Sequence, residues 1–316
     1  MKKGISYWSF SEDLGSPNPP YDQVFRFAKQ HGYDAVEVSV SEDPAHILRF
    51  GATTDEIEAV RDAATAAGIE ISSVASGDYW GVSPTSGDPA MRKKALGFMK
   101  EQLRIAAELE AGTILVVPGA VQPQFLPQAE HVPYQEAWKR ASSVIGQAAK
   151  TAEKHGVVIG IENVWNRMLL SPLEMRSFCE QFQSDFVKCY LDVGNVLFNG
   201  FPQDWIEILG RKDRETKRSY LAALHVKDFR THFFLGGETG VLAEVREGCK
   251  QIARGSGWTG AYAFCDLGEG DLPQDALRQS LKKVGFKGYL TVEMLPPTKG
   301  VVAKSSQAMD KLMGRV

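Results

Sequence analysis

Four residues that can bind a metal ion stand at the ends of short apolar segments. Glu162 follows VIGI, and Asp192, His225 and Glu293 end CYLD, LAALH and LTVE in the same way. Three carboxylates with one imidazole form a hard donor set that suits Mn²⁺, Mg²⁺ or Co²⁺, with Zn²⁺ as a further option. Taken singly, each acidic residue is better explained as a loop residue, and His225 as a hydrogen-bonded interior histidine. Together they predict a site for one divalent metal ion, because a buried isolated carboxylate is costly.

These residues need a scaffold that brings strand ends together, and eight apolar segments can supply it. The segments are rich in Val, Ile and Leu without strict alternation, which is typical of strands covered on both faces. They span residues 4–8, 34–39, 69–76, 113–119, 157–163, 187–195, 221–228 and 288–294. Amphipathic helical patterns lie between them.

Helix start and stop signals separate the expected strands. Thr53 with Glu56, and Ser171 with Glu174, predict capping boxes. A glycine that can end a helix precedes strands two to five. These glycines are Gly32, Gly68, Gly112 and Gly156.

Alternating strands and helices predict an α/β fold, a (β/α)8 TIM barrel. We expect a single domain over residues 1–316 with an insertion between strands seven and eight, at about 239–254. An open doubly wound sheet is the alternative, but no G-x-G-x-x-G follows the first strand. In a barrel the C-terminal ends of the strands carry the chemistry, and the four residues fall at such ends.

Composition narrows the class of protein. The formal net charge of −3 and the lack of a basic run argue against a nucleic-acid partner. None of the four cysteines lies in a C-x-x-C pair, so a reducing compartment is expected. MKKGISYWSF lacks the apolar core of a signal peptide, and no apolar run reaches the roughly 18 residues of a membrane span. We therefore expect a cytoplasmic protein without a membrane partner.

Several motifs resemble those of the sugar (phosphate) isomerase/epimerase superfamily, the xylose-isomerase-like TIM barrels. They are IEN, LDVGN, HVKDF and TVEM, with ENVWNRMLLSPLEM and LGEGDL typical of bacterial members. The resemblance is greatest to ketose and ketose-phosphate 3-epimerases. It implies that Glu162, Asp192, His225 and Glu293 bind one divalent ion, usually Mn²⁺. Many free-ketose epimerases have a histidine where this chain has Asn195, which favours the phosphate branch.

Glu162 and Glu293 are the expected acid/base pair. Removing a proton beside a ketone forms an enediolate, whose charge a divalent metal stabilises. Epimerisation needs an acid/base group on each face of the carbon. We therefore predict a metal-dependent epimerase or isomerase of a ketose or ketose phosphate. The alternative is a metal-dependent lyase or dehydratase on a keto-sugar or inosose, including deglycosidase-type elimination. A non-catalytic sugar-binding subunit is disfavoured by the intact ligand set.

Five further residues are candidates for binding the sugar or sugar phosphate. They are Asn195, Lys227, Trp165, Arg230 and Glu37. Trp165 could instead pack within its loop, and Lys227 and Arg230 could pair with acidic neighbours or lie in solvent. Glu37 could instead orient the ligand histidine or form an ion pair within the barrel. We also expect a homo-oligomer, dimer or tetramer, because exposed helices of such barrels often pair.

Overall fold

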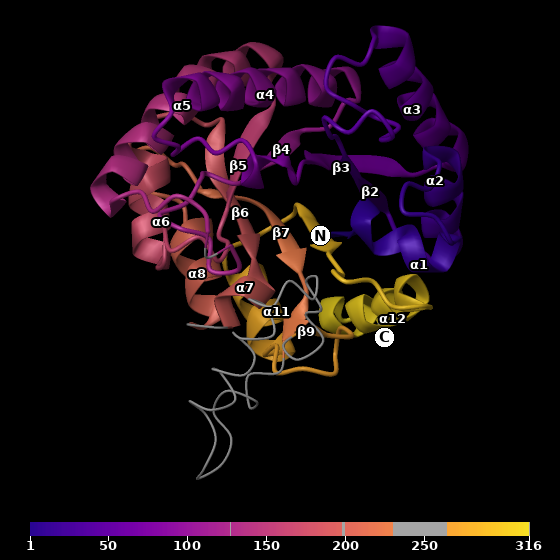
Figure 1. Ribbon diagram of the computed structural model, residues 1–316. Coiled ribbons are helices and arrows are strands. Elements are labelled where there is room, and N and C mark those ends of the chain that lie inside the picture. The colour runs from indigo at the N-terminus through magenta and orange to yellow at the C-terminus, as the bar shows by residue number, and fades with distance from the viewer. Residues whose placement is uncertain (127, 198–199, 230–263, 316) are drawn as a thin grey trace.

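A closed barrel of eight parallel strands forms the centre of the protein. The computed structural model describes residues 1–126, 128–197, 200–229 and 264–315. The strand order is β1-β10-β7-β6-β5-β4-β3-β2, with helices around the outside (Figure 1). The barrel strands are β1 (Lys2–Ser6), β2 (Ala35–Ser39), β3 (Glu70–Ala75), β4 (Thr113–Val116), β5 (Val158–Glu162), β6 (Val187–Asp192), β7 (Leu221–Val226) and β10 (Tyr289–Val292). The predicted (β/α)8 barrel is confirmed.

At two of the strands that end earlier than the sequence suggested, a helix begins at the next residue. The first ends at Ser6, and Tyr7–Phe10 form the 3₁₀ helix η1. The sixth ends at Asp192, and helix α7 (Val193–Leu197) begins at the next residue. Tyr7 and Val193 are as buried as the strand residues before them. The apolar pattern therefore continues past both strand ends and conceals them.

The described helices lie between consecutive barrel strands, except for α12, which follows the last of them. Besides η1 and α7, they are α1 (Ser11–Leu14), α2 (Tyr21–Gln30), α3 (Thr54–Ala67), η2 (Asp78–Trp80), α4 (Pro89–Glu108), α5 (Tyr134–His155), α6 (Pro172–Glu180), α8 (Pro202–Gly210), α11 (Gln274–Lys283) and α12 (Val301–Met313). Thr53 and Glu56 form the full capping box of α3. At α6 the box is incomplete, because the Glu174 carboxylate accepts a hydrogen bond from the N–H of Leu170 rather than that of Ser171.

Helix ends also follow local signals. Gly68 and Gly156 adopt the left-handed conformation after α3 and α5, with φ of 64° and 69°. Before β4 the left-handed residue is Glu110, with φ of 59°, instead of the expected Gly112.

A short antiparallel pair flanks the segment that holds the expected insertion. β8 (Asp228–Phe229) pairs with β9 (Phe264–Cys265). The Asp228 carboxylate accepts hydrogen bonds at 2.8–3.0 Å from four backbone N–H groups. Three of these belong to residues 268–272, so Asp228 ties HVKDF to LGEGDL. The insertion at about 239–254 and the candidate Arg230 lie outside the described residues.

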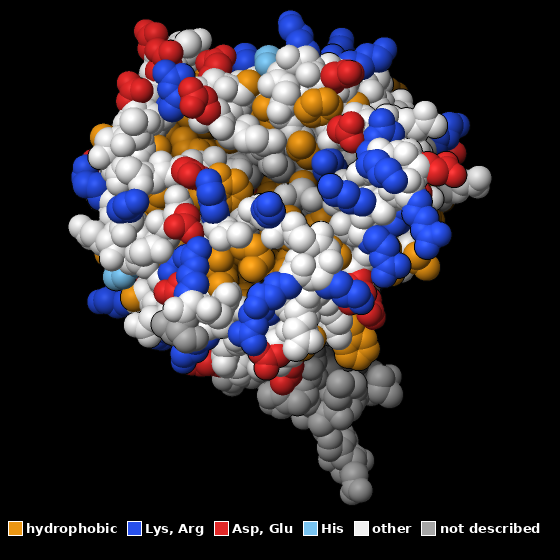
Figure 2. All heavy atoms as spheres, turned by 180° about the vertical axis from the view of Figure 1, so that it is seen from behind, with side chains coloured by type: hydrophobic (Ala, Val, Ile, Leu, Met, Phe, Trp, Pro, Cys, Tyr) orange, Lys and Arg blue, Asp and Glu red, His pale blue; other side chains and the backbone are white. Residues whose placement is uncertain are grey.

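The core is apolar, and the face drawn in Figure 2 carries side chains of both charges. Apolar side chains fill the layer between strands and helices, and a second cluster comprises Ala75, Leu115, Tyr190 and Ala223. Lys and Arg side chains lie beside Asp and Glu side chains over the face drawn in Figure 2. Within the described part of the chain, no helix has both the length and the apolar character needed to cross a membrane.

Candidate metal centre and active site

The four predicted ligands meet at the C-terminal ends of neighbouring strands. Glu162, Asp192 and His225 come from β5, β6 and β7, and Glu293 directly follows β10. The register places Asp192 beside His225, and the Glu293 N–H donates to the carbonyl of Val226. All four ligands are buried, and one donor atom from each lies within 4.8 Å of the others.

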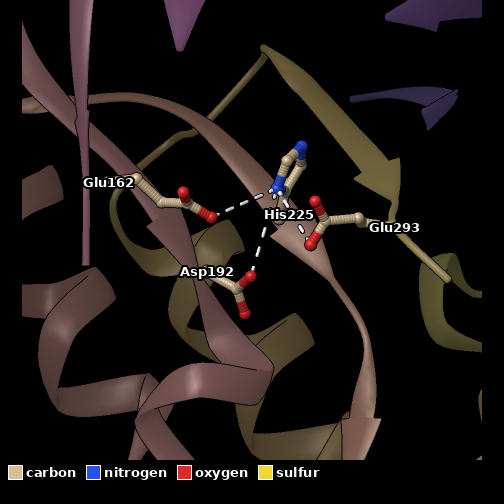
Figure 3. A group of neighbouring side chains, drawn as sticks. All are labelled: Glu162, Asp192, His225 and Glu293. Atoms are coloured by element: carbon tan, nitrogen blue, oxygen red, sulfur yellow. Dashed lines mark ion pairs between the residues drawn. The ribbon is translucent and has the colours of Figure 1, made fainter. Parts of the chain in front are cut away.

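His225 Nδ1 is the centre of this cluster (Figure 3). It lies 3.5 Å from Glu162 Oε1, 3.6 Å from Glu293 Oε2 and 4.0 Å from Asp192 Oδ2. Glu162 and Glu293 approach it from opposite sides. These separations fit oxygen and nitrogen atoms bound to one common ion at about 2.0–2.3 Å.

The chemistry of the donor atoms also fits a metal ion. His225 Nδ1 is buried and makes no hydrogen bond to any described residue. Buried polar atoms without a partner are rare and call for an explanation. A nitrogen that faces three carboxylates without bonding to them is explained by a cation between them. The set therefore fits one divalent ion.

Glu37 sets the orientation of the His225 ring. Its Oε1 lies 2.8 Å from His225 Nε2. Its Oε2 accepts hydrogen bonds from Ser73 Oγ and Tyr190 Oη, both at 2.8 Å. Register shifts occur at Val36/Glu37 in β2 and at Cys189/Tyr190 in β6, and such bulges redirect side chains. Carboxylates commonly orient metal-binding histidines in this way.

The structure thus places Glu37 behind His225, in the orienting arrangement. It is fully buried and is not among the residues that line the cavity next to the cluster. Ser73 and Tyr190 were missed in the sequence, where they carry no signal that separates them from ordinary strand residues.

Two asparagines fix Asp192. Asn163 donates to the carbonyl of Asp192 at 2.9 Å and accepts from its N–H at 2.8 Å. Asn195 donates its amide to the carbonyl of Asn163 at 2.9 Å, and its backbone N–H donates to Asp192 Oδ1 at 2.8 Å. The motifs IEN and LDVGN are therefore joined by hydrogen bonds, and Asn195 supports the candidate ligand Asp192 as well as lining the cavity.

Lys227 points into the carboxylate cluster. Its Nζ lies 2.8 Å from Asp192 Oδ2 and forms an ion pair with Glu293 Oε2. Burial opposes its charge, but Asp192, Glu293 and Glu162 outweigh burial and raise the pKa of Lys227. The pairing with acidic neighbours expected for Lys227 is therefore observed, and the solvent-exposed alternative is not.

A cavity of about 480 Å³ opens beside the cluster. Glu162, Glu293 and Lys227 line it, so the acid/base candidates face a space in which a small molecule fits. Its aromatic lining comprises Trp8, Trp80, Phe125 and Trp165. Trp165 therefore reaches the cavity and does not only pack within its loop.

A family model described as the xylose isomerase-like TIM barrel matches residues 25–312. The chain belongs to this family. The resemblance and the fold class expected from the sequence motifs are confirmed.

Named relatives of this xylose isomerase-like barrel include sugar epimerases. L-ribulose-5-phosphate 3-epimerase UlaE of Salmonella paratyphi A is 22% identical over 75% of this chain and 78% of that protein. Among solved structures, an L-ribulose 3-epimerase has a TM-score of 0.71 at 14% identity, over 100% of this chain and 95% of that one. D-psicose 3-epimerase of Clostridium cellulolyticum H10 has a TM-score of 0.68 at 20% identity, over 100% and 95%. The likeness to the solved structures is one of fold.

The two glutamates of this xylose isomerase-like site have opposite pKa shifts. Burial raises the pKa of Glu162 to about 7, opposed by the neighbouring His225 ring and aided by the charges of Glu293 and Asp192. Burial acts on Glu293 as well, but the charges of Lys227 and His225 outweigh it and lower the pKa of Glu293. Near neutral pH the metal-free site therefore combines an ionised Glu293 with a Glu162 that is protonated in about half of the molecules.

Metal binding to this site should release protons at pH 6 and tighten as the pH rises. Burial lowers the pKa of His225, but Glu37 and Glu293 outweigh it and raise the pKa well above its usual range. Glu162 also holds its proton up to about pH 7, and metals bind the deprotonated ligands. Between pH 5 and 7 we expect the apparent Kd for Mn²⁺ to fall by about tenfold per pH unit for each proton released. Calorimetry at pH 6 in two buffers of different ionisation enthalpy measures the release.

The raised pKa of Glu162 also determines how the stability of the metal-free protein changes with pH. The pKa of Glu162 is raised from 4.5 to about 7 on folding. The contribution of Glu162 to the stability of the metal-free protein is therefore complete below pH 4.5 and is lost as the pH rises to about 7.

The control for proton release is Glu162→Gln, which should release fewer protons than the wild type on binding Mn²⁺. Equal heats in both buffers for the wild type would contradict the expectation.

Proposed function

We propose that this protein is a divalent-metal-dependent epimerase or isomerase of a ketose or ketose phosphate. The observation that carries the proposal is the unbonded Nδ1 of His225 facing three buried carboxylates beside a cavity. The names of the relatives, which include ketose and ketose-phosphate 3-epimerases, support the same class of substrate.

Glu162, Asp192, His225 and Glu293 would hold the metal, and we propose Mn²⁺, with Co²⁺, Mg²⁺ and Zn²⁺ as alternatives. When bound, a divalent ion supplies positive charge to substrate oxygens on which negative charge develops. Glu37 keeps the His225 ring turned so that Nδ1 faces the carboxylates.

Glu162 and Glu293 are the proposed acid and base. Both line the cavity, and they approach the cluster from opposite sides (Figure 3). One of the two carboxylates accepts the proton beside the ketone, and the other returns a proton to the same carbon from the other side. Asn195, Lys227 and Trp165, which also line the cavity, are the proposed substrate contacts.

The reaction is tested by proton exchange in heavy water. The Mn²⁺-loaded protein is incubated with a panel of ketoses and ketose phosphates, and products are analysed by NMR. Deuterium beside the ketone together with a new epimer or isomer is the expected result. Loss of water or of a leaving group would instead support the lyase or dehydratase alternative. Absence of exchange with every sugar, together with no metal uptake, would overturn the proposal.

The expected cytoplasmic location and the expected homo-oligomer, a dimer or tetramer, stay predictions from the sequence.

A further inference from the structure

The ammonium group of Lys227 contacts two carboxylate oxygens that are expected to bind the metal. Its Nζ contacts Asp192 Oδ2 and Glu293 Oε2. These two oxygens also face His225 Nδ1, at 4.0 and 3.6 Å. The ammonium group and a bound metal ion would therefore share two carboxylates.

Helix α7 makes the space for this lysine. A Cβ atom at Gly194 would collide with Lys227 Cγ and would lie 2.9 Å from the Lys227 carbonyl oxygen. Gly194 does not have a positive φ, so the close contact, and not the backbone conformation, calls for glycine. Lys227 is 6% exposed. Its stem is thus confined, and the ammonium group is held in place beside the ligands.

The charges at the site explain why a fixed ammonium group belongs there. Four carboxylates surround His225, namely Glu37, Glu162, Asp192 and Glu293. One divalent ion offsets only half of their combined charge when all are ionised. Buried charges that are left uncompensated are strongly destabilising. In two-metal sites a second ion lies about 3.5–4 Å from the first and shares ligands with it. Lys227 supplies a second positive charge without a second metal.

We propose that Lys227 is a positioning residue that acts as a fixed second cation of the metal centre. It neutralises Asp192 and Glu293, supports the fold of the metal-free site, weakens binding of the divalent ion and limits the site to one ion per chain. This inference rests on the metal-dependent function proposed above. It predicts two effects of opposite sign when the charge is removed: the metal-free protein becomes less stable, and the divalent ion binds more tightly.

Lys227→Met tests the proposal, because it keeps the stem and removes the charge. Calorimetry of Mn²⁺ binding to metal-stripped protein should show one ion per chain in the wild type. The variant should have a Kd lower by about tenfold or more, because it removes the repulsion between the ammonium group and the divalent ion. Its Tm without metal should fall. Lys283→Met is the matched control, because Lys283 is exposed and pairs only with Glu207 among the described residues.

Gly194→Ala tests the same idea while keeping the lysine. It should displace the stem of Lys227 and shift the Mn²⁺ affinity in the same direction, and it carries the test if Lys227→Met does not fold. If the wild type binds no Mn²⁺, the proposed function and this inference both fail. If the wild type binds Mn²⁺ and the folded variants bind it equally or more weakly, only this inference is overturned.

Discussion

Replacing Glu293 with glutamine is expected to lower kcat for interconversion of two epimers by about 10²- to 10⁴-fold. Glutamine keeps the shape and one carbonyl oxygen of the side chain but cannot accept a proton. Glu293 can accept a proton because it is ionised: Lys227 and His225 outweigh burial and lower its pKa in the metal-free site. Glu293 approaches the cluster from the side opposite Glu162 (Figure 3), and the lining of the cavity among the described residues has no third carboxylate that could replace it.

The two single variants should differ in which epimer exchanges its proton. If each glutamate serves one face of the carbon, Glu293→Gln exchanges deuterium only with the epimer whose proton faces Glu162. Glu162→Gln should exchange only with the other epimer. Exchange is followed by NMR in heavy water, with bound Mn²⁺ quantified in the same samples because both residues are ligands. The matched control is Glu153→Gln, because Glu153 is exposed on the surface. Full epimerisation by either site variant would contradict the two-glutamate mechanism.

Replacing His225 with alanine is expected to abolish retention of the divalent ion. The change removes Nδ1, the only nitrogen of the predicted ligand set, and it leaves Glu37 without the ring that it contacts at 2.8 Å. Removing one member of a buried charged pair costs about 3–5 kcal/mol. We therefore expect the wild type to retain about one Mn²⁺ per chain, as in other single-ion sites. The variant should retain none and should unfold at lower denaturant concentration.

Two further variants separate loss of the ligand from general damage. His131→Ala removes an exposed histidine and should change neither metal content nor stability. Glu37→Gln keeps a hydrogen-bonding group next to Nε2 and should weaken metal binding by about 10- to 100-fold without abolishing it. A His225→Ala protein that still retains the ion after dialysis would remove His225 from the ligand set.

The sequence by itself determined the barrel and the four candidate ligands. Apolar runs that alternate with capped helical patterns are local signals, and seven of the eight barrel strands formed within the expected segments, while β1 begins two residues before its segment. A carboxylate or imidazole that ends such a run is costly unless it is paired. Because parallel strands of a barrel present their C-terminal ends on one face, listing those end residues was enough to predict that they meet.

Only the tertiary structure decided how the other residues serve the site. Glu37 was ambiguous between a sugar contact and a partner of His225, because its contact with the ring joins two strands that are distant in the sequence. Tyr190 and Ser73 had no signal at all, since hydroxyl groups in strands gain a role only from what lies across the barrel. The contact between Gly194 and Lys227 likewise joins two motifs that are separate in the chain. Such packing is set by distances between elements, and a single sequence specifies the elements more directly than the distances.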